Sequence, residues 1–115
     1  MLEDDPALNE LSKAAPAFAA LGDPVRLAMV ARLCKEGPLP TVALKEGMHV
    51  TRQGLTKHLN VLEDAGLVSS ERFGRDRRWR MQARRLAAAR NHLDRISAQW
   101  DLRLQRLRAL VEDGG

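Results

Sequence analysis

The last third of the chain carries an apolar residue at every seventh position, and this repeat constrains the fold more than any other feature. With the intermediate positions, its apolar residues are Leu86, Ala89, Leu93, Ile96, Trp100, Leu107 and Leu110. The spacing predicts one helix over residues 84–112, roughly 42 Å long at about 1.5 Å per residue. A small domain cannot cover a helix of that length, so part of its apolar face needs another chain.

The composition indicates one globular domain over residues 1–115, because 44% of the residues are hydrophobic and 30% are charged. Aromatic residues make up only 3%, which favours helices over sheet. No apolar run approaches the roughly 18 residues of a membrane span. The acidic start, residues 1–6, resembles a frayed tail rather than a secretory signal, and one cysteine cannot form an internal disulfide. We therefore expect a cytoplasmic protein.

Helical spacing and breaker residues predict two helices at the start of the chain. Apolar residues recur from Leu8 to Phe18, and Pro16 inside this run should kink the helix or begin a new turn. The sequence Gly22-Asp23-Pro24 then indicates a helix stop, an N-cap and the first residue of a second helix. That second helix should continue to Cys34.

Two threonines predict the caps of two further helices. Thr41 follows a Gly-Pro-Leu-Pro break and can cap a short helix that ends near Gly47. Thr51 can cap a longer helix that reaches about Ala65. Gly66 should end this helix in a left-handed conformation.

The apolar period changes from helical to alternating after Gly66. Residues 67–73 and 78–82 are expected to form two strands that flank the loop Gly74-Arg75-Asp76-Arg77. Trp79 and Met81 share one face of the second strand. Two short helices followed by a basic two-stranded hairpin predict a mainly α fold with a small β-hairpin, the winged helix-turn-helix.

Positive charge gathers around the predicted hairpin. Residues 72–85 contain seven arginines and a single acid, Asp76, in a chain of net charge +4. Such a density suits a polyanion such as nucleic acid. A solvated surface would carry the same charge, so charge alone leaves both interpretations open.

The helix that begins after Thr51 presents a polar outer face. Its packing against the preceding helix uses Leu44, Met48, Val50 and Leu55, and the side chains left outside are Arg52, Gln53, Thr56 and Lys57. Arginine can donate two hydrogen bonds to guanine, and glutamine can pair with adenine in the major groove. The face therefore predicts sequence-specific binding of double-stranded DNA. His58 can face either a DNA phosphate or the core.

Several segments, in this order, resemble the ArsR-type winged helix-turn-helix transcriptional regulators. They are residues 18–27 (FAALGDPVRL), 51–59 (TRQGLTKHL) with 61–68 (VLEDAGLV), and 74–79 (GRDRRW). The resemblance covers most of the chain from about residue 17 onward. It implies a homodimer that binds a partly palindromic operator, usually as a repressor.

The resemblance also implies which residues meet the duplex and which meet the second chain. The helix that begins after Thr51, the recognition helix, would lie at the major groove. The tip of the wing, which is the loop at residues 74–77, would lie at the minor groove or its phosphates. The expected DNA-binding residues are Thr51, Arg52, Gln53, Thr56, Lys57, His58, Arg75, Arg77 and Arg78. The first and last helices would form the dimer interface, through Leu8, Leu11, Leu86, Leu93, Ile96, Trp100 and Leu107.

The chain departs from the metal-sensing members of that family. The third helix has no cysteine over residues 42–46, and the last helix has His92 as its only histidine, with Asp94 and Asp101 nearby. A zinc site normally needs four ligands in tetrahedral array. The chain therefore resembles the metal-independent branch, and we expect no metal site and no cofactor. A metal-responsive sensor stays an alternative, with ligands shared across a dimer.

Other functions leave little trace in the sequence. There is no glycine-rich phosphate loop and no nucleophile beside a histidine, so we expect no enzyme and no catalytic residue. A winged-helix module that docks proteins without reading DNA is the main alternative. Cys34 should be a small core residue, and Trp79 and Trp100 should anchor the core and the interface. The sequence identifies no small-molecule inducer.

Overall fold

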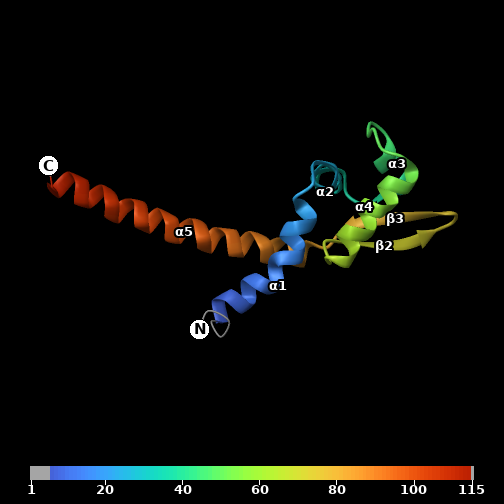
Figure 1. The fold of residues 1–115 in the computed structure, drawn as a ribbon. Helices are drawn as coiled ribbons and strands as arrows, with labels where there is room; N and C mark the ends of the chain where they lie inside the picture. Colours follow the sequence, from blue (N-terminus) through green and yellow to red (C-terminus); the bar gives the residue numbers. More distant parts are fainter. Residues whose placement is uncertain (1–5, 115) are drawn as a thin grey trace.

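The computed structural model describes the backbone of residues 6–114 and the side chains of residues 9 and 12–113. Five helices and three short strands follow one another along the described chain (Figure 1). In chain order they are α1 (Pro6–Leu21), α2 (Pro24–Glu36), β1 (Leu39–Pro40), α3 (Thr41–Lys45), α4 (Arg52–Asp64), β2 (Val68–Phe73), β3 (Asp76–Met81) and α5 (Ala83–Gly114). The winged helix-turn-helix prediction is confirmed: α3 and α4 form the helix-turn-helix, and β2 and β3 form the wing.

Two of the three predicted helix caps are confirmed. Oδ2 of Asp23 accepts hydrogen bonds from the backbone nitrogens of Val25 and Arg26, at 2.9 and 3.0 Å. The Thr51 hydroxyl accepts the N–H of Gly54 at 2.9 Å. Asp23 and Thr51 thus satisfy amide donors that have no partner within the first turn of α2 and α4.

The predicted cap at Thr41 is wrong. Pro40 occupies the N-cap position of α3 and Thr41 is the first helical residue. Its hydroxyl instead accepts a hydrogen bond from the indole N–H of Trp79 at 3.0 Å. A contact 38 residues along the chain competes for this side chain, and no local signal predicts it.

The first helix predicted at the start of the chain is present as α1. The tail expected at residues 1–6 lies outside the described residues except for Pro6, which begins α1. The helix then continues through Pro16 to Leu21 without ending.

The wing belongs to a three-stranded antiparallel sheet in the order β1-β3-β2, not to an isolated hairpin as predicted. β1 pairs with β3 through Leu39 opposite Trp79, within a segment that the sequence suggested was only a break. Pro40 is tolerated because β1 is an edge strand, where a missing N–H can face away from the ladder.

The turn of the wing is shorter than predicted. Phe73 pairs with Asp76, so only Gly74 and Arg75 connect the strands. Gly74 has φ +66°, as the first position of a two-residue type II′ turn requires. Asp76 and Arg77, expected in the loop, are therefore the first residues of β3.

The core forms where α2, α3 and α4 meet the sheet. Its fully buried side chains are Met29, Leu44, Leu55, Leu59, Leu62, Leu67 and Val68. Trp79 is also buried and belongs to the same cluster, as expected for a core anchor. The predicted left-handed helix end is confirmed, because Gly66 has φ +77° and turns the chain from α4 into β2.

Cys34 lies outside this core, contrary to prediction, and is exposed. The buried stripe of α2 consists of Met29, Val30 and Leu33. Leu27, which lies seven residues before Cys34 on the same side of α2, is itself 53% exposed. The apolar residues of α2 fit two neighbouring stripes, and only packing selects between them.

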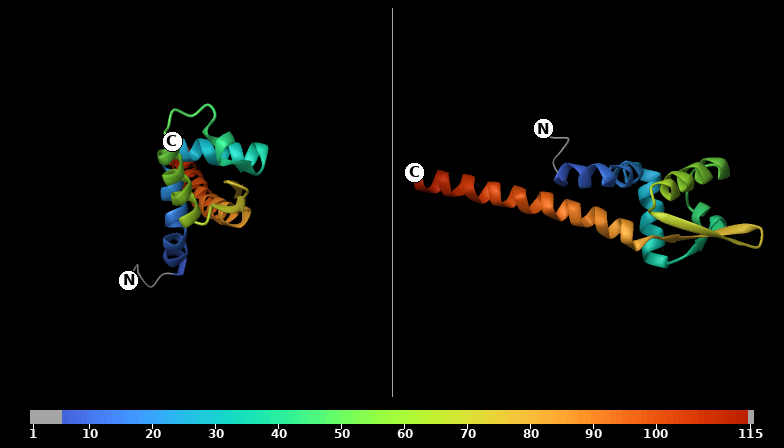
Figure 2. Two further views of the ribbon diagram at one scale, coloured as in Figure 1. Left: turned by 90° about the vertical axis from the view of Figure 1, so that its right-hand side faces the viewer. Right: turned by 90° about the horizontal axis from the view of Figure 1, so that it is seen from below.

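Helix α5 extends far beyond the rest of the molecule (Figure 2). Its 32 residues span about 48 Å at about 1.5 Å per residue, and the molecule measures 67 × 33 × 21 Å. Its first turns pack against α1, where Ala89 is buried. Among the described residues no single helix is long and apolar enough to cross a membrane. Ser12–Leu21 and Pro24–Glu36, which are bent by 94° relative to each other, together have the length and apolar composition of a membrane span.

Replacing Thr41 with valine should destabilise the fold by about 1–3 kcal/mol, because the variant removes the acceptor of the buried indole N–H of Trp79. Thr41→Ser keeps the hydroxyl and is the matched control. Urea unfolding of both variants at equal protein concentration measures the difference. Equal stability of the two variants would contradict the assigned role.

Candidate nucleic-acid interface

Helix α4 combines a buried face with an exposed polar face. Leu55, Leu59 and Leu62 point into the core. The opposite face exposes five of the residues predicted to meet DNA: Thr51, Arg52, Gln53, Thr56 and Lys57. The structure therefore brings these predicted residues together on one side of the first two turns of α4. This is the part of a recognition helix that enters a major groove.

His58 lies apart from this face, on the side of α4 that meets the start of α2. Its Nδ1 atom is 3.2 Å from Nη1 of Arg26 and 3.8 Å from Oδ2 of Asp23. Both partners lie where α1 ends and α2 begins. His58 therefore connects the recognition helix to the junction of these two helices.

Arg26 is the centre of that junction, and the sequence analysis assigned it no role. Its Nε donates to the carbonyl oxygen of Ala20 at 2.6 Å, in the last turn of α1. The backbone N–H of Arg26, together with the charges of His58 and Arg26, holds the pKa of Asp23 below its ordinary value of 3.8 and outweighs partial desolvation. The signal available in the sequence was the position of Arg26, three residues after the predicted N-cap Asp23.

The wing arginines fall on two faces of the hairpin. Arg75 lies in the turn, and Arg77 is a strand residue that lines the space facing α4. Arg78 stacks over the exposed ring of Phe73, 4.5 Å from its centroid. Successive side chains of a strand point to opposite faces of the sheet, so Arg78 points away from the face that carries Arg77 and Trp79. The structure thus separates Arg78 from the other two predicted wing residues.

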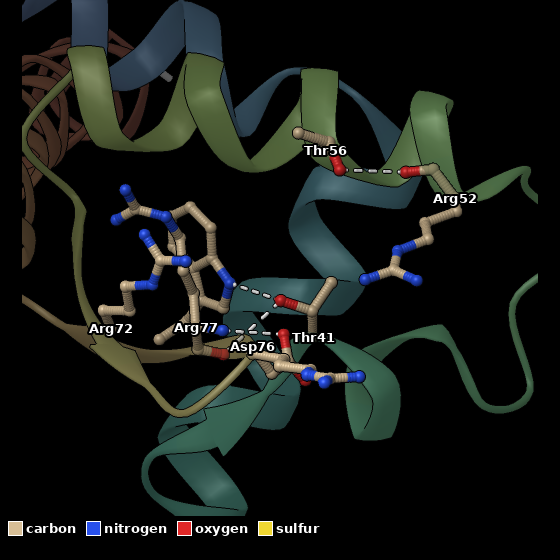
Figure 3. A pocket seen from close by; sticks show the side chains of 8 residues that line it. Thr41, Arg52, Thr56, Arg72, Asp76 and Arg77 are labelled. Carbon is tan, nitrogen blue, oxygen red and sulfur yellow. Dashed lines mark hydrogen bonds between the residues drawn. The ribbon is translucent and has the colours of Figure 1, made fainter.

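A cleft separates the first turns of α4 from the wing and has a volume of about 280 Å³. Its lining comes from α3, α4 and the wing: Thr41, Arg52, Thr56, Arg72, Arg75, Asp76, Arg77 and Trp79. Figure 3 shows Arg72 and Arg77 reaching from the wing towards α4, with Arg52 directed into the same space from above. Arg72, Thr41 and Asp76 were not predicted to line this cleft. Strand register places Arg72 opposite Arg77, and contacts between α3 and the wing bring Thr41 and Asp76 together.

Asp76 is the single acid in the cleft lining, and its carboxylate is engaged by the fold. It accepts the backbone N–H of Arg77 at 2.7 Å and that of Val42 at 3.3 Å. Burial alone would raise the pKa of Asp76, but hydrogen bonds from Thr41 and these amides, with the charge of Arg52, hold it below 3.8. Asp76 therefore stays ionised at neutral pH and ties the wing to the start of α3.

The predicted interface residues of α5 lie along an exposed apolar line. Leu86 is partly buried, Leu93 and Ile96 are about half exposed, and Trp100 is 60% exposed. Leu107 continues the line towards the C-terminal end, and the side chains of Leu8 and Leu11 lie outside the described residues. At its base, an apolar groove of about 640 Å³ runs between α1 and α5 and includes Phe18, Leu21, Leu86 and Leu93. No element in the described part of the chain covers it.

Comparison with known proteins identifies similar chains. Residues 21–71 match a family model described as a helix-turn-helix domain. The HTH-type transcriptional regulator Rv2034 of Mycobacterium tuberculosis is 35% identical over 99 residues, which cover 86% of this chain and 89% of that protein. The arsenical resistance operon repressor of Bacillus subtilis is 35% identical over 71 residues, covering 62% of this chain and 68% of that protein.

Solved structures agree with these sequence matches. An ArsR-like transcriptional regulator from Rhodococcus sp. RHA1 superposes with a TM-score of 0.71 and 34% identity. The match covers 87% of this chain and 93% of that chain. It therefore extends well beyond the helix-turn-helix alone.

Proposed function

The chain belongs to the ArsR family of helix-turn-helix transcriptional regulators, and we propose that it represses transcription as a homodimer bound to a two-fold symmetric operator in the cytoplasm. The observation that carries the proposal is the exposed polar face of α4 beside a cleft rich in arginine. That face is narrow enough for the major groove, and the wing extends beyond it. In this proposal residues 1–115 act as one DNA-binding domain.

Two kinds of DNA contact divide the interface. Gln53 and Lys57 have exposed side chains on α4, where base edges of the major groove come within reach. Arg75 lies at the wing tip, where a duplex offers phosphates and a degenerate minor groove. Contacts of the first kind discriminate between sequences, whereas contacts of the second kind add affinity for any duplex.

The exposed apolar face of α5 supports the homodimer in this proposal. Trp100, Leu107 and Leu110 are between 59% and 71% exposed in a single chain. A contiguous apolar face of this size is normally covered by a partner. Heptad spacing suits a second copy of the same helix, and pairing two copies would present two α4 helices to one duplex.

The arsenical resistance repressor raises metal sensing as a second candidate function, but the residues of this chain favour a regulator without a metal site. The third helix lacks a cysteine, and the last helix carries one histidine, His92. Within the described side chains, no group of three or more His, Cys, Asp or Glu residues is placed to hold a metal ion. We therefore propose that DNA release is not controlled by thiophilic metals.

The proposal as a whole is tested by mapping bound DNA across the genome of the host and then measuring affinity for a recovered site over a salt series. A DNA regulator should recover short sites with two-fold symmetry and bind them less tightly as salt rises. A protein-docking module would recover no shared sequence and show no salt-dependent duplex binding.

Replacing Gln53 with alanine should weaken binding to the operator by about 1–3 kcal/mol and binding to scrambled DNA much less, because the variant cannot hydrogen-bond a base. Arg75→Ala should weaken both alike and lower the salt slope by about one per protomer, because it removes a charge that neutralises one phosphate. Titration of both duplexes with each variant over a salt series measures the two effects. The reverse pattern would exchange the roles of helix and wing.

Replacing Trp100 with glutamate should dissociate the homodimer, because the variant places a charge where an apolar side chain would be buried. Sedimentation velocity at micromolar concentration measures the change. Glu112→Gln, near the exposed end of the same helix, is a control that should stay dimeric. A wild-type protein that sediments as a monomer would refute the dimer itself.

Zinc, cadmium or arsenite should leave operator affinity unchanged, because a ligand that does not distinguish the bound and free states cannot shift their equilibrium. The measurement is operator binding with each ion and again after chelation. Release of DNA by a stoichiometric metal would instead support the metal-responsive alternative.

A further inference from the structure

The cleft between α4 and the wing has the charge of an anion site. Its lining includes one carboxylate and four arginines, Arg52, Arg72, Arg75 and Arg77. That carboxylate belongs to Asp76, which already accepts two backbone N–H groups. Among the described residues, none of the four arginines forms an ion pair with an acidic side chain. The cleft lining therefore carries a net positive charge.

Arg77 is held in a defined orientation within this cleft. Its Nη1 donates to the hydroxyl of Ser70 at 2.8 Å, and that hydroxyl donates to Glu63 of α4 at 2.9 Å. One of the five guanidinium donors is thus used for positioning, and the others are available to a ligand. These hydrogen bonds also connect the wing to α4, and so help to hold the two walls of the cleft in a fixed position relative to each other.

The geometry of duplex DNA identifies the occupant, given the proposed function. A sugar-phosphate backbone separates the major groove from the neighbouring minor groove. If α4 lies in the first groove and the wing tip reaches the second, that backbone passes between them. The space between them is this cleft, which has a volume of about 280 Å³. It has room for one phosphate group and several waters.

We propose that Arg52, Arg72 and Arg77 form a clamp for a single backbone phosphate of the bound duplex. This assigns Arg72 a role and changes that of Arg52, which the sequence placed among the base-reading residues. Arg52 projects into the cleft, whereas Gln53 and Lys57 remain on the exposed face of α4. Planar guanidinium groups can each donate paired hydrogen bonds to phosphate oxygens, which suits several arginines sharing one phosphate.

The test compares Arg52→Ala, Arg77→Ala and the double variant on a mixed-sequence DNA duplex over a salt series. Each single variant should bind about tenfold more weakly, because each substitution removes a charge-assisted hydrogen bond. The double variant should lower the salt slope by no more than about one per protomer, because the arginines share one phosphate. Its combined effect on the binding free energy should be smaller than the sum of the two single effects, because the arginines share a ligand.

Arg80→Ala is the matched control. Arg80 lies on the same strand, carries the same charge and pairs with Glu71 at 3.1 Å on the face away from the cleft. It should change neither affinity nor slope by a comparable amount. Circular dichroism and thermal unfolding verify that each variant is folded, and Arg72→Ala replaces Arg77→Ala if removal of the bond to Ser70 disturbs the wing.

The outcomes separate the clamp from the proposed function. If the wild type binds duplex DNA but the cleft variants behave like Arg80→Ala, the clamp is refuted and DNA binding stands. If the double variant lowers the slope by about two per protomer, the arginines meet separate phosphates and the single-phosphate clamp is wrong. A wild type without salt-dependent binding would refute the clamp and the proposed function together.

Discussion

The hydrogen bond from the buried indole of Trp79 to Thr41 joins the wing to the helix-turn-helix, and the proposed DNA-facing surface depends on this junction. The strand pair of Leu39 with Trp79 and the contact of Asp76 with the start of α3 reinforce it. Together they hold the hairpin at one angle to α4. Without them the wing would be a two-stranded ribbon, which is marginally stable alone, and its arginines would not face Arg52 across a cleft.

A second polar junction sets the position of α4 relative to the other end of the molecule. Asp23 caps α2, Arg26 binds the last turn of α1, and His58 of α4 meets both side chains. One short turn therefore connects the helix proposed to read DNA with the helix that packs against α5. In a homodimer, the position of α4 relative to α1 would set the spacing of the two α4 helices, and with it the spacing of the two DNA half-sites.

Charge and apolar surface are separated along the long axis of the molecule. Four arginines and one carboxylate line the cleft at the wing end, while α5 carries exposed apolar side chains over several turns. Each surface lacks a partner within the described part of the chain, and each has a chemistry that selects a different one. Guanidinium groups favour phosphate, and a heptad of large apolar residues favours another helix. The proposed dimeric regulator needs both kinds of surface, at opposite ends.

Features that local physical chemistry controls could be read from the amino acids alone. The caps at Asp23 and Thr51, the left-handed Gly66 and the long apolar repeat of α5 all depend on residues close together in the chain. The polar face of α4 was predictable for the same reason, since helical periodicity places its residues. Long-range packing decided the other features. Thr41 bonds Trp79 rather than its own helix, Cys34 lies on the unburied stripe of α2, and His58 turns towards Arg26. Arg72 and Arg77 share a cleft with Arg52 only because strand register and sheet packing bring distant segments together, and no local pattern encodes that pairing.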